Sequence, residues 1–325
     1  MTVLITGGAG YIGSHMTYAL LDRGERVVVL DNLSTGIRGL VAHEATMVEG
    51  DVADGALVKA LIARHKIESV IHFAGSIVVP DSVAEPLRYY DNNTIASHRL
   101  VAACIEAGIQ NFIFSSTATV YAETARQPMS EGEPKDPISP YARSKLMTEW
   151  ILEDAARAHG LRHAVLRYFN VAGADPKGRT GQSTPKATHL IKRACQVALG
   201  RVPHLDIFGT DYSTPDGTGV RDYIHVADLV TAHLLALDHL RADNAGLVCN
   251  CGYGHGTSVR EIVRVVERVT GRTLPTREGP RRPGDPPTLI ADPTRLKTEL
   301  NWQPQFDDLD TIVAHAFAWE RRQNA

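Results

Sequence analysis

Residues 3–31, VLITGGAGYIGSHMTYALLDRGERVVVLD, decide the fold. The apolar run Val3–Thr6 predicts a buried strand, and after a glycine-rich turn Tyr11–Arg23 carries apolar residues at helical spacing. A glycine ends this helix, and Arg26–Leu30 predicts a second buried strand that closes on Asp31. A strand, a helix and a strand in this order predict a βαβ unit with parallel strands.

Similar units continue through the first half of the chain. Near-continuous apolar strands that alternate with helices are typical of a parallel sheet covered by helices on both faces. We therefore predict an α/β fold: a doubly wound parallel sheet of the Rossmann type with a smaller mixed α/β C-terminal domain. Further strands are expected at Thr46–Glu49, Ser69–Phe73, Asn111–Phe114 and His163–Tyr168, and helices at Gly55–Arg64, Asn92–Ala107 and Tyr141–His159.

The turn Gly7–Gly13, GGAGYIG, lies where a phosphate-binding turn is expected. Glycines permit positive φ and let the backbone approach a pyrophosphate, which rests on the amides of the helix N-terminus. Asp31 follows about 20 residues on and can accept the ribose hydroxyls of an adenosine. A 2′-phosphate near this carboxylate would cost about 3 kcal/mol at an effective dielectric near 20, which favours NAD over NADP.

Asp51 follows the third predicted strand in the run G-D-V. Its carboxylate suits the amino group of an adenine. It can equally cap the helix that begins near Gly55, because Asp is a preferred N-cap residue.

Tyr141 and Lys145, in Y-A-R-S-K, open the long predicted helix. Their i, i+4 spacing places the phenol and the ammonium group on one helix face. A phenol that acts as a base at neutral pH needs its pKa lowered by roughly three units, which a lysine and a cationic nicotinamide can supply together. The run Ser115–Thr119 precedes them at a strand end, so hydroxyl, phenol and ammonium groups are expected at one sheet edge.

The composition excludes several classes of protein. With 34 basic and 37 acidic residues the formal charge is -3, which gives no electrostatic case for a nucleic acid or membrane partner. No apolar run approaches the roughly 20 residues that span a bilayer, and the N-terminus lacks an export signal. Four cysteines indicate free thiols in the cytoplasm, and the Cys249 and Cys251 pair, in a strand-like run, favours a buried strand over a metal site.

The length of 325 residues allows about two domains. Between Val171 and Pro185 the composition turns to Gly, Pro, Lys and Thr, so we place the boundary there. We predict an NAD-binding domain over residues 1–172 and a substrate-binding domain over 173–325, with parts around 220–240 returning to the first domain. Helices are expected near Leu190–Leu199, Val226–Leu240, Ser258–Thr270 and Leu309–Arg321, and loops at Ala125–Pro140, on the surface, and Leu274–Pro287.

Over essentially its full length the chain resembles the extended short-chain dehydrogenase/reductases. It closely resembles the UDP-glucose 4-epimerase (UDP-galactose 4-epimerase) family. The motifs that carry the resemblance are TGGAGYIGSH from Thr6, DNL from Asp31, HFAG from His72, YYDNN from Tyr89, SSTATVY from Ser115, YARSK from Tyr141, YFNVAGA from Tyr168, DGTGVRDYIHV from Asp216 and RRPGD from Arg281.

The resemblance implies a role for each matching residue. The catalytic set is Thr117, Tyr141 and Lys145. NAD is held by Gly7, Gly10, Tyr11, Ile12, Gly13, Asp31, Asn32, Asp51, Val52, Phe73, Ala74, Gly75, Asn92, Tyr141, Lys145 and Tyr168. The UDP-sugar is held by Thr117, Asn170, Leu190, Phe208, Arg221, Arg282, Asp285 and Leu289.

The chemistry of these side chains suits a nucleotide sugar. Arg221 and Arg282 can neutralise a pyrophosphate through bidentate forks, and Asp285 can accept ribose hydroxyls. Arg221 can instead pair with Asp222 or Asp228, and Phe208 can instead be an ordinary core residue.

Two residues depart from the family pattern. Ile77 stands where some members have a lysine near the cofactor phosphates. Leu289 stands where a tyrosine often bounds the sugar pocket, which leaves the range of accepted sugars open.

The resemblance implies reversible NAD-dependent epimerisation at C4 of UDP-hexoses, UDP-glucose to UDP-galactose, through a 4-keto intermediate, and a homodimer. UDP-N-acetylhexosamines are further candidate substrates. The alternatives are a UDP-pentose 4-epimerase, a nucleotide-sugar dehydratase or decarboxylase, or a non-catalytic NAD-sensing protein. A dehydratase needs an acid pair after the active-site threonine, whereas Ala118 and Thr119 follow here.

Overall fold

The computed structural model describes residues 1–184, 188–282 and 285–323. In this part of the chain, seven parallel strands form one sheet in the order β11-β6-β5-β4-β1-β2-β3. The order reverses direction at β1, which confirms the doubly wound sheet. The strands are β1 (Thr2–Thr6), β2 (Arg26–Asp31), β3 (Thr46–Glu49), β4 (Ser69–His72), β5 (Asn111–Thr117), β6 (Arg162–Tyr168) and β11 (Leu247–Cys251).

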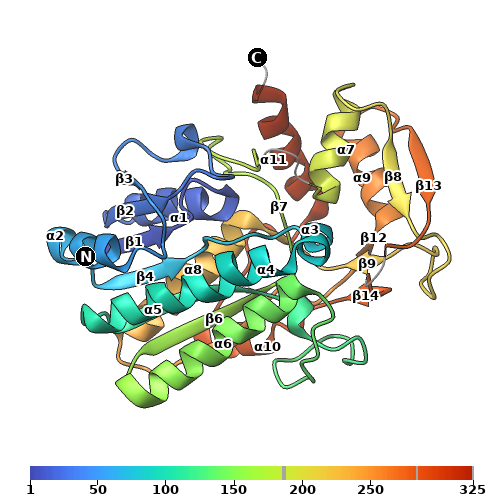
Figure 1. Cartoon of the computed structure of the whole chain (residues 1–325). Coiled ribbons are helices and arrows are strands. Elements are labelled where there is room, and N and C mark those ends of the chain that lie inside the picture. The colour runs from blue at the N-terminus through green and yellow to red at the C-terminus, as the bar shows by residue number, and fades with distance from the viewer. Residues whose placement is uncertain (185–187, 283–284, 324–325) are drawn as a thin grey trace.

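Helices cover both faces of this sheet (Figure 1). Val3 and Ile5 of β1 join the core formed with α1 and α8, whereas Leu4 joins the core formed with α2, α5 and α6. Successive side chains of a strand point to opposite faces, so a strand buried on both faces must be continuously apolar. The bounds are α1 (Tyr11–Asp22), α2 (Gly55–His65), α5 (Ala96–Glu106), α6 (Pro140–His159) and α8 (Val226–Arg241).

A smaller mixed α/β region lies at one end of the molecule, and Figure 1 shows β8, β13, α7 and α9 together there. Short strands pair as β8 with β13, β7 with β10, and β9 with both β12 and β14. Their bounds are β7 (Asn170–Ala172), β8 (Leu205–Phe208), β9 (Val220–Arg221), β10 (Tyr223–His225), β12 (Thr257–Ser258), β13 (Thr276–Gly279) and β14 (Thr288–Leu289). The helices are α7 (Leu190–Ala198), α9 (Val259–Thr270), α10 (Thr294–Leu300) and α11 (Leu309–Arg322).

Several boundaries differ from the sequence predictions. The strand predicted to end at Phe114 continues to Thr117, and the one predicted to reach Phe73 ends at His72. The helix predicted over residues 92–107 begins earlier, as the two short helices α3 (Val79–Ala84) and α4 (Pro86–Tyr89) lead into a π-helical stretch at Tyr90–Ile95. The segment Leu274–Pro287, expected to be a loop, contains the strand β13, which pairs with β8. Its residues Pro283 and Gly284 lie outside the described residues.

The loop over residues 125–140, predicted on the surface, is partly buried. Met129 is 3% exposed and forms a β-bridge with Ala291. Both belong to a small apolar core that also contains Tyr121 and Leu146. Residues 126–128, 132, 134–136 and 138 are exposed, as predicted. The burial of Met129 was not predicted, because its partner Ala291 lies far along the chain, where no local pattern indicates it.

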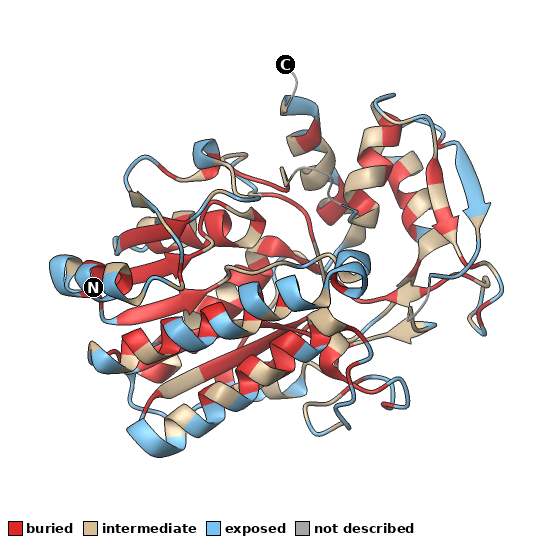
Figure 2. Cartoon of the chain, viewed as in Figure 1, coloured by how far each residue is buried: buried red, intermediate tan, exposed pale blue. Residues whose placement is uncertain are grey.

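Burial follows the layers of the fold. Figure 2 shows the central strands buried throughout, while α5 and α6 are buried only on the faces they turn to the sheet. Cys249 and Cys251 are buried free thiols in β11, as expected from their alternation. Among the helices that the structure describes, none is long and apolar enough to cross a membrane.

Candidate active site

The residues predicted to hold the cofactor follow the carboxyl ends of neighbouring strands. Because parallel strands end at one edge of the sheet, these residues lie side by side along that edge. In order across the sheet they are Asp51 and Val52 after β3, Asp31 and Asn32 at β2, Gly7 to Gly13 after β1, Phe73 to Gly75 after β4, Thr117 at β5 and Tyr168 at β6. This edge includes the point beside β1 where the strand order reverses, which is where open α/β sheets bind ligands.

The glycine turn leaves no room for side chains. Gly7 has φ +71°, and a Cβ atom there would lie 2.6 Å from the amide nitrogen of Ala74. A Cβ atom on Gly13 would lie 2.3 Å from the carbonyl oxygen of Gly7, and one on Gly10 3.2 Å from the same oxygen. The turn thus leads tightly into α1, whose first-turn amides lack helical partners and can bind an anion.

The side chain of Tyr11 points away from this turn. Its hydroxyl donates to the carbonyl of Gly173, 2.7 Å away, and burial raises the pKa of the phenol. Tyr11 and Ile12 therefore offer backbone amides to the turn, while the Tyr11 ring joins α1 to the segment after β7.

Asp31 and Asp51 lie at the β2 and β3 side of this sheet edge, where the adenosine part of the cofactor is predicted to bind. Asp31 is 7% exposed, and its carboxylate accepts hydrogen bonds from the amides of Ala9 and Leu33. Asn32 donates to Asp51 over 3.2 Å, so these residues lie together. The helix-capping alternative for Asp51 is wrong, because Asp54 caps α2 through the amide of Leu57.

The segment after β4 is held by an asparagine that the sequence analysis missed. Asn93 is buried; it accepts from the amide of Ser76 and donates to the carbonyl of Ser76 and the hydroxyl of Ser144. The predicted residue, Asn92, is exposed and donates to the Ser76 hydroxyl. Asn93 shares the buried helix face with Ser97 and Leu100, a periodicity that was available in the sequence.

The three predicted catalytic residues converge at the ends of β5 and α6. Thr117 ends β5, and Tyr141 lies in the first turn of α6, whose N-terminus is capped by Ser139. Lys145 is 3% exposed, and its ammonium group donates to the carbonyl of Ser115 over 2.9 Å.

Burial controls the ionisation of this set. It raises the pKa of Tyr141 to about 12, against a smaller opposing effect of a hydrogen bond with Thr117. It lowers the pKa of Lys145 to about 8, against the opposing charge of Glu149. A phenolate at Tyr141 near neutral pH would therefore need positive charge beyond that of Lys145.

Tyr168 and Phe73 share one support, His233. The imidazole Nδ1 contacts the carbonyl of Leu229 at 2.8 Å, and a carbonyl only accepts, so Nδ1 carries the proton. The Nε2 atom therefore accepts from the Tyr168 hydroxyl at 2.5 Å, while the ring packs 5.1 Å from that of Phe73. The hydroxyl proton of Tyr168 is therefore engaged by His233.

The predicted substrate residues Arg221 and Asp285 form an ion pair. Arg221 is buried and also donates to the carbonyl of Val220 over 2.8 Å. Asp222 and Asp228, the alternative partners, instead accept backbone amides and the Tyr253 hydroxyl. The alternative pairing of Arg221 is therefore wrong.

Two further arginines stack on aromatic rings beside this pair. Arg282 lies 4.1 Å over Phe208, which is half-buried and not an ordinary core residue, and Arg281 lies 4.4 Å over Tyr212. They line an open cavity of about 440 Å³. Its lining residues are Glu123, Tyr212, Arg281, Arg282, Asp285, Pro286 and Pro287. Of these, the sequence analysis named only Arg282 and Asp285 as site residues.

Asn170 and Leu289 lie on strands next to Arg221. The amide of Asn170 donates to the carbonyl of Asp222, and Leu289 is in register with Arg221 between β14 and β9. Leu289 is half-buried and packs against the small core that contains Phe169. Ile77, the other departure from the family pattern, is exposed.

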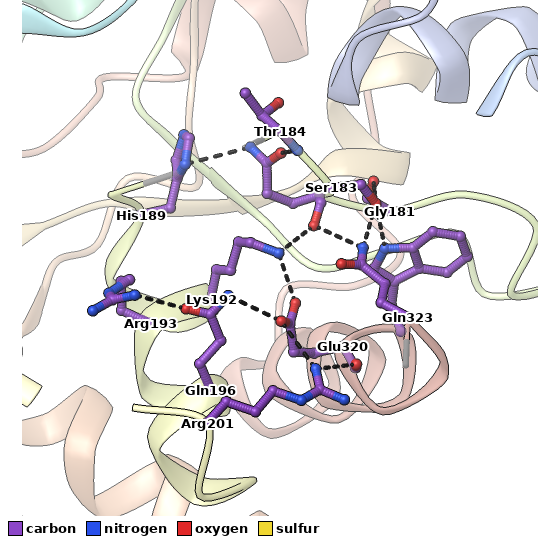
Figure 3. Close-up of polar contacts among 12 residues, drawn as sticks. Gly181, Ser183, Thr184, His189, Lys192, Arg193, Gln196, Arg201, Glu320 and Gln323 are labelled. Atoms are coloured by element: carbon purple, nitrogen blue, oxygen red, sulfur yellow. Dashed lines mark hydrogen bonds and ion pairs between the residues drawn. The ribbon is translucent and has the colours of Figure 1, made fainter. Parts of the chain in front are cut away.

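Leu190 begins α7, which a buried polar cluster ties to α11. Glu320 accepts from Lys192 at 2.7 Å, from Gln196 at 3.0 Å and from Arg201 at 3.2 Å (Figure 3). Lys192 also donates to the carbonyl of Gln182 over 2.7 Å, so Gln182 is held by the same cluster. These contacts define where the first turn of α7, and with it Leu190, lies.

The fold and this site define a class of enzyme. A doubly wound sheet with a glycine turn after β1, an aspartate at the end of β2 and a threonine, tyrosine and lysine at the β5 edge is a short-chain dehydrogenase/reductase of the extended type.

The chain belongs to the NAD dependent epimerase/dehydratase family, whose model matches residues 3–252. A UDP-glucose 4-epimerase of Azospirillum brasilense is 56% identical over 98% of this chain and 92% of that protein. The structure of UDP-glucose 4-epimerase from Brucella ovis in complex with NAD is 46% identical, with a TM-score of 0.95 over 98% of this chain and 97% of that one. The UDP-Glc/GlcNAc 4-epimerase from Campylobacter jejuni is also 46% identical, with a TM-score of 0.86 over 99% of both chains.

Proposed function

We propose that this protein catalyses the reversible, NAD-dependent inversion of C4 in UDP-hexoses, UDP-glucose to UDP-galactose. The observation that carries the proposal is the placement of Thr117, Tyr141 and Lys145 at the same sheet edge as the glycine turn, in a chain that matches UDP-glucose 4-epimerases over nearly its full length. No specific observation favours a dehydratase or a non-catalytic role.

The residues present fit NAD. A Cβ atom on Gly7 or Gly13 would clash with backbone atoms, so glycine at both positions permits the tight turn on which a pyrophosphate can rest. Asp31 ends β2, at the position expected to accept the ribose hydroxyls of adenosine. NAD held by these residues would supply a hydride acceptor for C4 of the sugar and, once reduced, a hydride donor to the opposite face of the resulting 4-keto sugar.

The chain's own residues move the proton. Tyr141, as the phenolate, accepts the proton of the C4 hydroxyl, and Thr117 hydrogen-bonds that oxygen. Lys145 provides a fixed positive charge one helical turn from Tyr141, which favours the phenolate, and it lies beside Gly75 of the cofactor cleft.

The substrate residues hold the nucleotide and leave the sugar free to turn. Arg221 and Arg282 supply charge for the diphosphate, and Asp285, already paired with Arg221, can accept ribose hydroxyls. The sugar can then present either face to Tyr141 while UDP stays bound.

The direct test incubates the purified protein with UDP-galactose without added NAD and separates the products. We expect UDP-glucose to form up to an equilibrium mixture, because the hydride is returned and no cofactor is consumed. A product lighter by one water, or a requirement for continuous NAD supply, would replace this proposal by a dehydratase or a dehydrogenase.

The range of sugars is expected to depend on Leu289. A leucine lacks the ring and hydroxyl of a tyrosine, which leaves volume for an N-acetyl group at C2 beside the half-buried segment of β14. We expect slower but measurable epimerisation of UDP-N-acetylglucosamine. Leu289→Tyr should abolish that activity and spare UDP-glucose, since the clash penalises one substrate only. An equal loss of both activities in a two-substrate assay would show that Leu289 is not the size gate.

The proposal includes a homodimer and a cytoplasmic location. Large apolar side chains are exposed on neighbouring helices of one outer layer: Val83 on α3, Leu87 on α4, Ile95 before α5 and Trp150 on α6. An apolar surface of this kind suits an interface, and four buried free thiols suit a reducing compartment.

A charge on this helix layer should separate the subunits. The side chain of Leu87 is 76% exposed. We expect the wild type to sediment as a dimer, and the variant Leu87→Asp to shift toward the monomer without loss of folded structure. A wild type that sediments as a monomer at all concentrations would refute the dimer and leave the catalytic proposal standing.

A further inference from the structure

The catalytic face of α6 carries a third ionisable residue. Tyr141, Lys145 and Glu149 are spaced i, i+4 and i+8, so they lie on one side of the helix. Each meets a different residue of the same short stretch of β5: Tyr141 meets Thr117, Lys145 meets Ser115, and Glu149 meets Ser116.

Glu149 is held on both carboxylate oxygens. Oε1 accepts from the Ser116 hydroxyl at 2.5 Å and from Nε of Arg167 at 3.1 Å, and Oε2 accepts from Nη2 of Arg167 at 2.6 Å. Glu149 is 7% and Arg167 2% exposed. A bidentate pair at this depth has little freedom to rotate, so the charge of Glu149 occupies a fixed place one turn from Lys145.

Arg167 extends the network away from the site. Its Nη1 donates to the Tyr121 hydroxyl at 2.9 Å and to the carbonyl of Glu131 at 3.3 Å. Tyr121 in turn donates to Asn250 over 2.7 Å. The guanidinium group is therefore directed toward the loop after β5, while the carboxylate of Glu149 lies on the Lys145 side.

Other titratable groups face Tyr141, Lys145 and Glu149 from the neighbouring elements. His72 on β4 is buried, and burial lowers its pKa to about 3, so it is neutral near Lys145. Tyr168 on β6 and Tyr89 on α4 face Tyr141, and burial raises the pKa of both phenols. Lys135, from the loop before α6, faces Glu149 and Arg167. Among these groups Glu149 is the carboxylate that acts on Lys145.

We propose that Glu149 is a positioning residue of the proposed epimerase reaction: held by Arg167 and Ser116, it keeps Lys145 charged and keeps α6 aligned with the end of β5. Burial by itself favours the neutral amine, and a neutral Lys145 would no longer favour the Tyr141 phenolate. The inference rests on the proposed function only for its kinetic readout.

The test is the pH profile of kcat for Glu149→Gln. Removal of a negative charge lowers the pKa of Lys145, so Lys145 loses its proton at lower pH. We expect the alkaline limb of the profile to move down by about one unit, a tenfold change in proton affinity. Glu149→Asp, which keeps the carboxylate, should restore most of the shift. A Glu149→Gln profile that is lower at every pH with both limbs unmoved would overturn the proposal, because a merely structural role predicts that result.

Glu153→Gln is the matched control, because Glu153 lies one turn further along α6 and its exposed carboxylate pairs with Arg157. It should keep the wild-type profile. If Glu149→Gln does not fold, the double variant Glu149→Leu with Arg167→Met replaces the buried pair by apolar groups. It should move the alkaline limb in the same direction but by less, because the positive charge of Arg167 is lost with the carboxylate.

A second readout does not depend on turnover. Lysine labelled with ¹³C at Cε reports the protonation of Lys145 by NMR in the NAD-bound protein, with Lys145→Met identifying the signal. The midpoint should be lower in Glu149→Gln than in the wild type. An unchanged midpoint overturns the role of Glu149, whereas a lowered midpoint in a protein that does not interconvert UDP-hexoses would uphold it and reject the proposed function.

Discussion

Tyr141→Phe is expected to lower kcat for the interconversion of UDP-galactose and UDP-glucose by about 100- to 10,000-fold, the usual contribution of a general base. The ring at the start of α6 keeps its packing, and only the group that accepts the C4 proton is lost. The affinity for the UDP-sugar should therefore stay close to that of the wild type, since Arg221 and Asp285 lie on other elements. Steady-state kinetics together with calorimetric binding of UDP-glucose measure both quantities.

The size of the effect also tests how the phenol is ionised. Burial raises the pKa of Tyr141 to about 12, so turnover near neutral pH requires positive charge from Lys145 and from bound NAD. Wild-type kcat should fall as the pH drops, because the phenolate is protonated. Tyr141→Phe should lose this acid limb. A variant that keeps wild-type kcat would remove Tyr141 from the catalytic set.

The parts of the fold that the sequence predicted correctly rest on local patterns. Val27–Leu30 of the strand predicted over Arg26–Leu30 is an apolar run bounded by turn residues, and the structure has this strand within one residue of its predicted ends. The glycine turn was readable because only glycine fits there, as the close approach of Gly7 to Ala74 shows. Such features are set by neighbouring residues in the chain, which a sequence displays directly.

The parts that were missed depend on contacts between distant residues. Arg221 and Asp285 are 64 residues apart, and no spacing rule favours that pair over Asp222 next door. The bridge from Met129 to Ala291 buries one part of a loop whose composition is that of a surface segment. Two-residue strands such as β9 and β14 carry no periodicity that could be detected.

Two results of the sequence analysis stay predictions: the roles of the site residues and the division of the chain into two domains at residue 172. The main sheet contains a strand from beyond residue 172, so the two domains are not two consecutive halves of the chain. β11, from residues 247–251, pairs with β6 at the edge of the main sheet, and α8 packs against β5, β6 and α1. The sequence of a segment such as β11 can predict a strand, but it does not show which strand of the first domain it pairs with.

Gly13→Ala is expected to abolish retention of NAD. In an ordinary helix this change is stabilising by up to about 1 kcal/mol, because alanine is the better helix former. At Gly13 the added Cβ would lie 2.3 Å from the carbonyl oxygen of Gly7 and 2.8 Å from the Cα of Gly8, and both are backbone atoms that cannot rotate away. The turn must therefore open, and the first-turn amides of α1 lose their alignment toward a pyrophosphate.

The measurement compares the NAD released on denaturation with the amount of protein. The wild type should carry close to one NAD per subunit through purification, since the reaction never requires its release, and Gly13→Ala should carry less than about a tenth of that. It should also unfold at lower temperature, because a ligand that binds only the folded state stabilises it by mass action. Gly39→Ala is the control, as a Cβ there meets no described atom within 4 Å. Full retention of NAD by Gly13→Ala would mean that the turn after β1 does not hold the pyrophosphate, because the geometry leaves no way to fit both the methyl group and the present turn.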